Sequence, residues 1–189
     1  MARFTQAQLL AFRGAELPDL IGPGLRLLFV GINPGLRTAA VQTHFAHPGN
    51  RFYPALLEAG IIESRIDPSD GMSDADREAF VARGLGVTNL VSRASARADE
   101  LSAEELRAGG ERLVALVERH RPRVIAIAGI TAYRSAFGLR RAVAGLQPEP
   151  LAGSALWVVP NPSGLNAHET VSTLAVAYGA AARAAAVIE

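Results

Sequence analysis

The stretch LLFVGINPG, residues 27–35, joins an uninterrupted apolar run to a polar turn. A run that is apolar at every position is typical of a strand buried on both faces, as in a parallel sheet. Pro34 biases Asn33 towards an extended backbone, and Gly35 permits a close approach that a Cβ would block. The segment predicts a buried strand ending in a specialised loop, although Asn-Pro-Gly also forms ordinary turns.

Two further segments, residues 124–128 and 156–159, have the same apolar character, and residues 87–91 predict another short strand. Helical patterns lie between them and in the tail, residues 168–188, and the pairs Thr5 with Gln8 and Ser102 with Glu105 form capping boxes. Strands that alternate with helices indicate a parallel sheet covered on both faces. We therefore expect a single-domain α/β protein, three-layer α/β/α, with a central, mainly parallel four-stranded sheet. The domain would span residues 1–189, with residues 1–22 as an N-terminal helical extension.

Composition excludes several kinds of chemistry. The chain has 189 residues and no cysteine, which rules out disulfides, cysteine-ligated zinc, iron–sulfur clusters and thiol catalysis. The four histidines are scattered, and only the pair His44 and His47 has a spacing that could ligate a metal. We expect no metal and no cofactor. Glu16 and Asp19 interrupt the only candidate secretory segment, and no apolar run is long enough to cross a membrane. A cytoplasmic protein, in the bacterial cytoplasm or nucleoid, is the resulting expectation.

The distribution of charge is more informative than the net charge of +1. All 19 basic residues are arginine, which suits bidentate phosphate contacts, although a GC-rich genome gives the same bias. Residues 20–57, 79–98 and 150–168 contain no acidic residue. If these segments share one face, that face would tolerate a polyanion such as DNA. An accident of loop composition is the alternative.

A second unusual loop, NPSGLN at residues 161–166, follows the last apolar segment. Leu165 stands there among polar and turn-forming residues. Proteins that bend DNA push such apolar side chains between bases, so Leu165 is a candidate wedge. The alternative is a loop residue that packs onto the core.

Taken together, these segments resemble the mismatch-specific uracil/thymine-DNA glycosylase family. GINPGL at residues 31–36 is similar to the catalytic motif of that family, and FAHP at 45–48 with NRF at 50–52 is similar to its base-stacking segment. GVTNLV at 86–91 matches the middle strand, and NPSGL at 161–165 the DNA-insertion loop. The matches run in order from about Gly24 to Tyr178, which is over three quarters of the chain.

The resemblance implies roles for individual residues. Asn33 would position the attacking water in a largely dissociative reaction, because a neutral amide is a poor base. Phe45 would stack on the flipped base, and the other pocket residues would be Ile32, Gly35, Thr38 and Asn89. Leu165 would fill the gap left by the base, with Gly164 and Asn166 facing the orphaned partner. Phosphate contacts are expected from Asn161, Ser163, Arg51 and Arg93.

The chain also departs from the family pattern. Asn166 and Ala167 stand where relatives carry Ser-Arg, and Asn89 replaces a lysine found in some of them, so the preferred lesion and opposite base stay open. Asp99 is a further departure, because relatives tend to have a non-acidic residue there. It is a candidate general base beyond a strand end, and alternatively an acid that favours the start of the Ser102 helix.

The sequence therefore predicts a monofunctional DNA glycosylase that initiates base excision repair. Lyase activity is not expected, because the chain has no lysine for a Schiff base. The expected partner is double-stranded DNA with uracil or a mismatched base, bound by a monomer, with no membrane or metal involved. Two rival functions are a lesion-binding protein that does not cut DNA and a small-molecule α/β enzyme with a nucleotide-like ligand.

Overall fold

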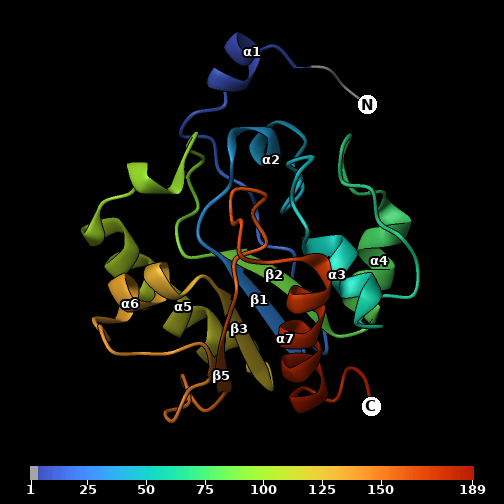
Figure 1. The fold of residues 1–189 in the computed structure, drawn as a ribbon, viewed down its shortest axis with the longest axis vertical. Coiled ribbons are helices and arrows are strands. Elements are labelled where there is room, and N and C mark those ends of the chain that lie inside the picture. Colours follow the sequence, from blue (N-terminus) through green and yellow to red (C-terminus); the bar gives the residue numbers. More distant parts are fainter. Residues whose placement is uncertain (1–3) are drawn as a thin grey trace.

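The structure, a computed structural model, describes residues 4–189 and is built around one five-stranded sheet (Figure 1). The strand order is β2-β1-β3-β5-β4. Four strands are parallel: β1 (Leu27–Gly31), β2 (Leu85–Asn89), β3 (Val124–Ala128) and β5 (Ala155–Val159). These are the predicted strands, but the prediction of four strands in total was wrong. The two-residue strand β4 (Gly145–Leu146) pairs antiparallel with β5 at the edge.

Helices cover both faces of the sheet, which confirms the three-layer α/β/α prediction (Figure 1). One face packs against α3 (Phe52–Glu58), α4 (Asp74–Ala82) and α7 (Val171–Ala184). The other face packs against α5 (Ala103–His120) and α6 (Ile130–Phe137). Three short helices complete the fold: α1 (Gln6–Leu10), α2 (Leu36–Ala40) and the 3-10 helix η1 (Ala98–Glu100). None of the helices in residues 4–189 combines the length and apolar character that a membrane span requires.

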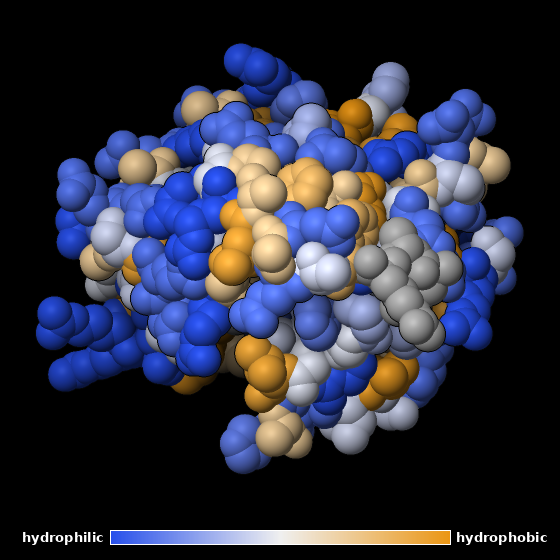
Figure 2. Space-filling view, turned by 90° about the horizontal axis from the view of Figure 1, so that it is seen from above, coloured by the Kyte–Doolittle hydropathy of each residue, from blue (hydrophilic) through white to orange (hydrophobic). Residues whose placement is uncertain are grey.

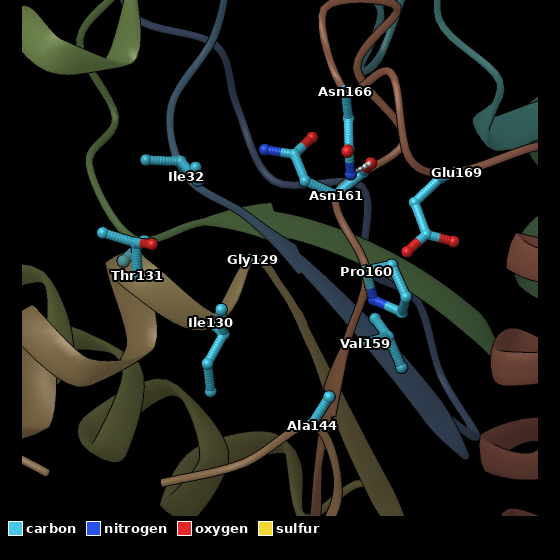
Figure 3. Close-up of a pocket in the computed structure, with 11 residues that line it drawn as sticks. Ile32, Gly129, Ile130, Thr131, Ala144, Val159, Pro160, Asn161, Asn166 and Glu169 are labelled. Atoms are coloured by element: carbon cyan, nitrogen blue, oxygen red, sulfur yellow. Dashed lines mark hydrogen bonds between the residues drawn. The ribbon is translucent and has the colours of Figure 1, made fainter. Parts of the chain in front are cut away.

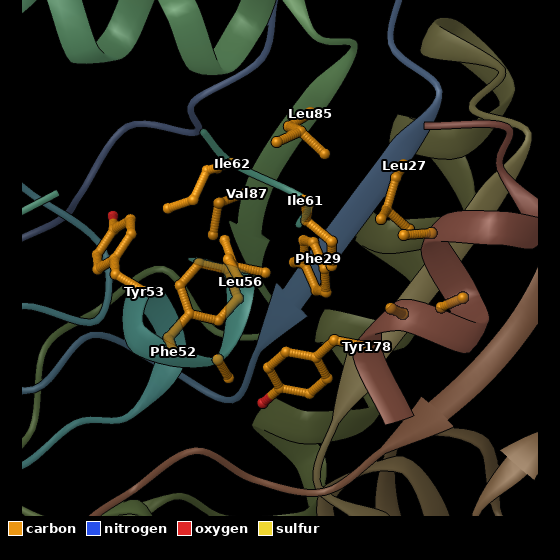
Figure 4. Close-up of a cluster of buried hydrophobic side chains, with 14 of the residues drawn as sticks. Leu27, Phe29, Phe52, Tyr53, Leu56, Ile61, Ile62, Leu85, Val87 and Tyr178 are labelled. Carbon is orange, nitrogen blue, oxygen red and sulfur yellow. The ribbon is translucent and has the colours of Figure 1, made fainter. Parts of the chain in front are cut away.

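The continuous apolar character of the strands follows from this arrangement. Along β1, Leu27 and Phe29 belong to the core cluster beneath α3 and α7, whereas Leu28 and Val30 belong to the cluster beneath α5. Figure 4 shows the first cluster, in which the ring of Phe52 lies edge-on to that of Phe29 with centroids 5.1 Å apart. Side chains alternate across a strand, so a strand that is covered on both faces must be apolar at every position.

The N-terminal segment is helical over only part of its length. Thr5 caps α1 in the predicted capping box with Gln8, and the helix ends at Leu10. The chain then lies along β2 and the loop that follows it, where Leu20 bridges antiparallel to Val87. The segment thus also supports the loop after β2.

The chain order of the strands creates a topological switch point beside β1. From β1 the chain first moves to β2 on one side and then to β3 on the other side of β1. In open α/β sheets, ligands bind beyond the carboxyl ends of strands where the order reverses in this way. The loops after β1, β2 and β5 emerge at this end, near α2 (Figure 1).

Candidate active site and DNA-binding face

The loop after β1 holds the Asn33 side chain in a defined orientation. Its Nδ2 donates hydrogen bonds to Ser95 Oγ at 2.8 Å, to the carbonyl oxygen of Arg93 at 3.2 Å and to that of Pro34 at 3.1 Å. Ser95 is buried, and its hydroxyl donates to the carbonyl oxygen of Arg97 at 2.6 Å, so its oxygen is left to accept from Asn33. The amide nitrogen is therefore turned into the loop, which leaves Oδ1 as the atom that can orient a water molecule.

Phe45 is held in a strained backbone conformation beside this loop. Its φ is +57°, in the left-handed region that bulky side chains rarely adopt and that costs about 1–3 kcal/mol. Its ring stacks on Phe52 with centroids 4.1 Å apart. The buried Thr38 hydroxyl accepts from the backbone N–H of Ala46 at 3.3 Å, which anchors the segment that follows. Strain maintained by the surrounding structure is typical of functional sites.

Asn89 lies at the carboxyl end of β2, paired in register with Gly31 of β1. A Cβ added at Gly31 would lie 2.4 Å from Asn89 Oδ1 and 3.3 Å from Phe45 Cζ. The amide of Asn89 and the ring of Phe45 thus converge over a position that only glycine leaves open. The guanidinium of Arg112 donates to the backbone carbonyl oxygen of Asn89 and so helps to fix the backbone at this residue. The structure therefore brings together Asn89 and Phe45, two residues expected in the base pocket.

Ile32 and Gly35 occupy different positions around this site. Gly35 caps α2, and a Cβ added to it would meet no atom within 4 Å, so the space beside it is open. Ile32 lines a cleft of about 310 Å³ beyond the carboxyl ends of β3 and β5 (Figure 3). The polar side chains around the cleft include Asn161, Asn166 and Glu169. This volume is within the range of small-ligand sites.

The loop after β5 is a compact turn that presents Leu165 to solvent. Asn161 Oδ1 accepts from the N–H of Ser163 at 3.0 Å, and Ser163 Oγ accepts from the N–H of Leu165 at 3.3 Å. Asn166 Nδ2 donates to the carbonyl oxygen of Asn161 at 3.2 Å. The side chain of Leu165 is 88% exposed, so it does not pack onto the core. Of the two sequence-based interpretations, the protruding side chain is the one present.

Arg51 connects this loop to the segment that carries Phe45. Its guanidinium donates to the carbonyl oxygens of Ser163 at 2.7 Å, Asn166 at 2.8 Å and Glu169. Its backbone N–H donates to the carbonyl oxygen of Pro162 at 3.0 Å. Sequence reasoning expected a phosphate contact here, whereas the structure shows an intramolecular clamp between two loops. This geometry leaves the phosphate contact of Arg51 untested, and the salt dependence of DNA binding distinguishes such a contact from the clamp.

Arg93 and Asp99 also form intramolecular ion pairs. Arg93 makes a two-pronged pair with Glu105 at the start of α5, through Nε and through Nη2 at 3.0 Å. Asp99 is exposed on η1 and accepts from Arg97 Nε and Nη2, at 3.0 and 2.7 Å to Oδ2. The hydrogen bond from Arg97 lowers the pKa of Asp99, which makes its carboxylate a weaker base. The two roles considered for Asp99, a general base and an acid that favours a helix start, are both untested, and its observed partner is Arg97.

Figure 2 looks onto this end of the molecule and shows hydrophobic and weakly polar residues at its centre, surrounded by hydrophilic ones. The three loops that meet here come largely from the acid-free segments, residues 20–57, 79–98 and 150–168. Within residues 4–189, no group of three or more histidine, aspartate or glutamate side chains is placed to hold a metal ion. Both ring nitrogens of His44 face protein atoms.

Sequence reasoning missed two contributors to the site. Ser95 fixes the Asn33 amide, yet nothing in its local sequence distinguishes it from an ordinary loop serine. His44 was considered only as half of a metal-binding pair, whereas the structure places its ring against Asn89. Its position immediately before Phe45 was the one available signal.

Two comparisons with known proteins concern the family and the fold of this chain. The family model of the uracil DNA glycosylase superfamily matches residues 18–180. Among solved structures, the chain is similar to a candidate uracil DNA glycosylase from Methanosarcina acetivorans, determined by solution NMR. The TM-score is 0.60 with 18% sequence identity, over 89% of this chain and 96% of that chain. At this identity the structural likeness concerns the fold.

Proposed function

This chain belongs to the uracil DNA glycosylase superfamily, and we propose that it is a monofunctional, mismatch-specific member of it. It extrudes uracil or a related mismatched or damaged pyrimidine from double-stranded DNA and hydrolyses the N-glycosidic bond. The observation that carries the proposal is the oriented amide of Asn33, which follows the carboxyl end of β1, where Phe45 and Asn89 converge.

The reaction needs little help from a catalytic general base. The N-glycosidic bond breaks first, and its electron pair leaves with the base as an anion. Pocket backbone N–H groups can stabilise that anion as an oxyanion hole does. Asn33 Oδ1 accepts a hydrogen bond from the water, whose oxygen then bonds to the anomeric carbon of the oxocarbenium-like sugar. The water's surplus proton ends on the departed base or in solvent. The chain contains no lysine, so no Schiff-base step follows.

Recognition is divided between the residues around the base, Phe45 and Asn89, and the loop after β5. Phe45 offers an aromatic face for the extruded base, a contact worth about 1–3 kcal/mol, and Asn89 offers its amide to the base edge. Leu165 enters the stack in place of the extruded base, and the polar groups of Asn161 and Ser163 contact the flanking phosphates. A single copy of the chain supplies all of these groups, so the proposed active species is a monomer.

The decisive experiment is a product assay. Duplexes with uracil, thymine or etheno-cytosine opposite guanine are incubated with the protein, and abasic sites are scored. Asn33→Ala should lose most excision while DNA affinity stays within a few-fold of wild type, because the amide acts on water rather than on the duplex. Arg141→Ala, at an exposed site in the loop after α6, is the control for handling and folding.

Each rival function has a distinct outcome. Salt-dependent lesion binding without abasic product from any duplex would identify a binding protein. DNA affinity that barely changes with salt would favour a small-molecule enzyme, because phosphate contacts must release counterions. An Asn33→Ala variant that cuts at the wild-type rate would refute the catalytic assignment.

A further inference from the structure

His44 is a buried histidine that the proposed reaction does not use. It immediately precedes Phe45, and its side chain is only 4% exposed. Its Nε2 lies 3.1 Å from the carbonyl oxygen of Pro18, and its Nδ1 lies 3.3 Å from Asn89 Nδ2. Its own carbonyl oxygen accepts from Tyr53 Oη at 3.1 Å. Both the ring and the backbone of His44 are therefore held in place.

The chemistry of these partners determines which nitrogen of His44 carries the proton. A carbonyl oxygen can only accept, so Nε2 must donate to Pro18. A neutral imidazole has one N–H, which makes Nδ1 an acceptor. The atom of Asn89 that faces Nδ1 must then be a donor, and in the amide only Nδ2 is one. The orientation of the Asn89 amide thus follows from the carbonyl of Pro18 by way of His44.

His44 stays neutral under ordinary conditions. Burial lowers its pKa to about 4, an effect larger than the opposing influence of the Pro18 carbonyl. The charged groups that act on it are Asp19, which raises the pKa, and Arg77, which lowers it. Near neutral pH the ring therefore has a single proton, and the carbonyl contact selects the Nε2-protonated form.

The other end of the Asn89 amide points to the site. Because Nδ2 is hydrogen-bonded to His44, Oδ1 of Asn89 lies over Gly31. A Cβ built on Gly31 would lie 2.4 Å from this oxygen and 3.3 Å from Cζ at the tip of the Phe45 ring. Asn89 thus presents an oxygen acceptor, and one remaining Nδ2 hydrogen, beside the ring on which the proposed function stacks the base. The N3–H and O4 of uracil complement this pair, whereas the N3 and amino group of cytosine oppose it.

We propose that His44 is a specificity-determining positioning residue, which holds the Asn89 amide in the orientation that accepts uracil and rejects cytosine. The inference rests on the proposed function, because it needs the extruded base to meet Asn89. A site that orients its hydrogen-bonding groups discriminates strongly, because the wrong base leaves buried polar groups unpaired. Without His44 the amide can rotate and serve either base.

The first test is the protonation of His44 in the full-length protein. Two-bond proton–nitrogen NMR correlations identify which ring nitrogen carries the hydrogen. We expect Nε2 to be protonated and Nδ1 bare from pH 6 to pH 8, because the pKa is near 4. A proton on Nδ1 would overturn the proposal, since Asn89 would then have to turn its oxygen towards His44.

The second test measures specificity with non-cleavable analogues. Deoxyuridine and deoxycytidine with a 2′-fluorine are placed opposite the same abasic-site analogue, so neither base has a pairing partner. We expect His44→Leu to reduce the ratio of uracil to cytosine affinity by about 10- to 100-fold, the scale of an unpaired polar group. His44→Asn keeps an acceptor near the position of Nδ1 and should largely restore the ratio. His120→Leu, at the exposed end of α5, is the matched control.

The outcomes separate this inference from the proposed function. Wild-type protein that excises uracil, together with a folded His44→Leu variant of unchanged affinity ratio, refutes the role of His44 alone. Wild-type protein that neither binds nor excises uracil refutes the proposed function. If His44→Leu does not fold, the NMR result and the ratio measured for His44→Asn decide: a ratio that collapses in His44→Asn despite correct folding contradicts the proposed geometry.

Discussion

Replacing Arg51 with methionine removes a guanidinium but keeps most of the apolar stem. Three carbonyl oxygens, of Ser163, Asn166 and Glu169, lose their donor. At about 1 kcal/mol for each hydrogen bond, the folded loop loses about 3 kcal/mol, less whatever water restores. For a chain of this length each 1 kcal/mol corresponds to about 2–4 °C, so the melting temperature should fall by about 6–12 °C at most.

The functional consequence should depend on the substrate. The clamp orders the loop that presents Leu165, so its loss should be most costly where the duplex resists opening. If about half of the lost stabilisation must be supplied to order the loop before the base is excised, the activation free energy on a well-paired duplex rises by about 1.5 kcal/mol. Excision then slows about tenfold. Single-turnover rates on single-stranded and duplex uracil substrates, compared at the same temperature, measure this difference. Arg140→Met, at an exposed position after α6, is the matched control.

Salt dependence distinguishes the clamp from a phosphate contact. If Arg51 bound phosphate, its removal would reduce the slope of log affinity against log salt by about 0.9. We expect the slope to be unchanged, because the donors already bind loop carbonyls. A reduced slope, with equal rate losses on single-stranded and duplex substrates, would refute the reasoning.

Three other changes test neighbouring parts of the site. Leu165→Ala should slow excision from duplexes far more than from single strands, because unstacking a base costs a few kcal/mol. Leu146→Ala is the control at another exposed leucine, and equal effects on the two substrates would count against a wedge. Asp99→Asn should leave the single-turnover rate near wild type, given its ion pair with Arg97, whereas a loss of about 10²-fold would reveal a general base. The open space at Gly35 should admit 5-substituted uracils, and inertness towards 5-fluorouracil and 5-hydroxymethyluracil in duplex DNA would contradict this.

The strands and helix starts were accessible from the sequence because their causes are local. An apolar run such as residues 124–128 has to be covered on both faces wherever the chain places it. Ser102 and Glu105 satisfy each other and the first N–H groups of α5 within one turn. The edge strand β4 escaped prediction because two residues carry no periodic pattern, and only pairing with β5 defines them.

The principal residues proposed for the site, such as Asn33 and Leu165, were also nominated from the sequence, since turn-forming loops directly follow buried strands and resemble a known family. Ser95 and His44 were not, because their local sequence carries no such signal. The working arrangement of the site was not predictable in this way. Asn33 and Ser95 are 62 residues apart, Asn89 and His44 are 45 apart, and Arg51 reaches Ser163 across 112 residues. Hydrogen-bond partners at such separations are set by how strand order and helix packing bring loop ends together. The sequence by itself thus determined which side chains are offered to the site, and the tertiary structure decided which donor meets which acceptor.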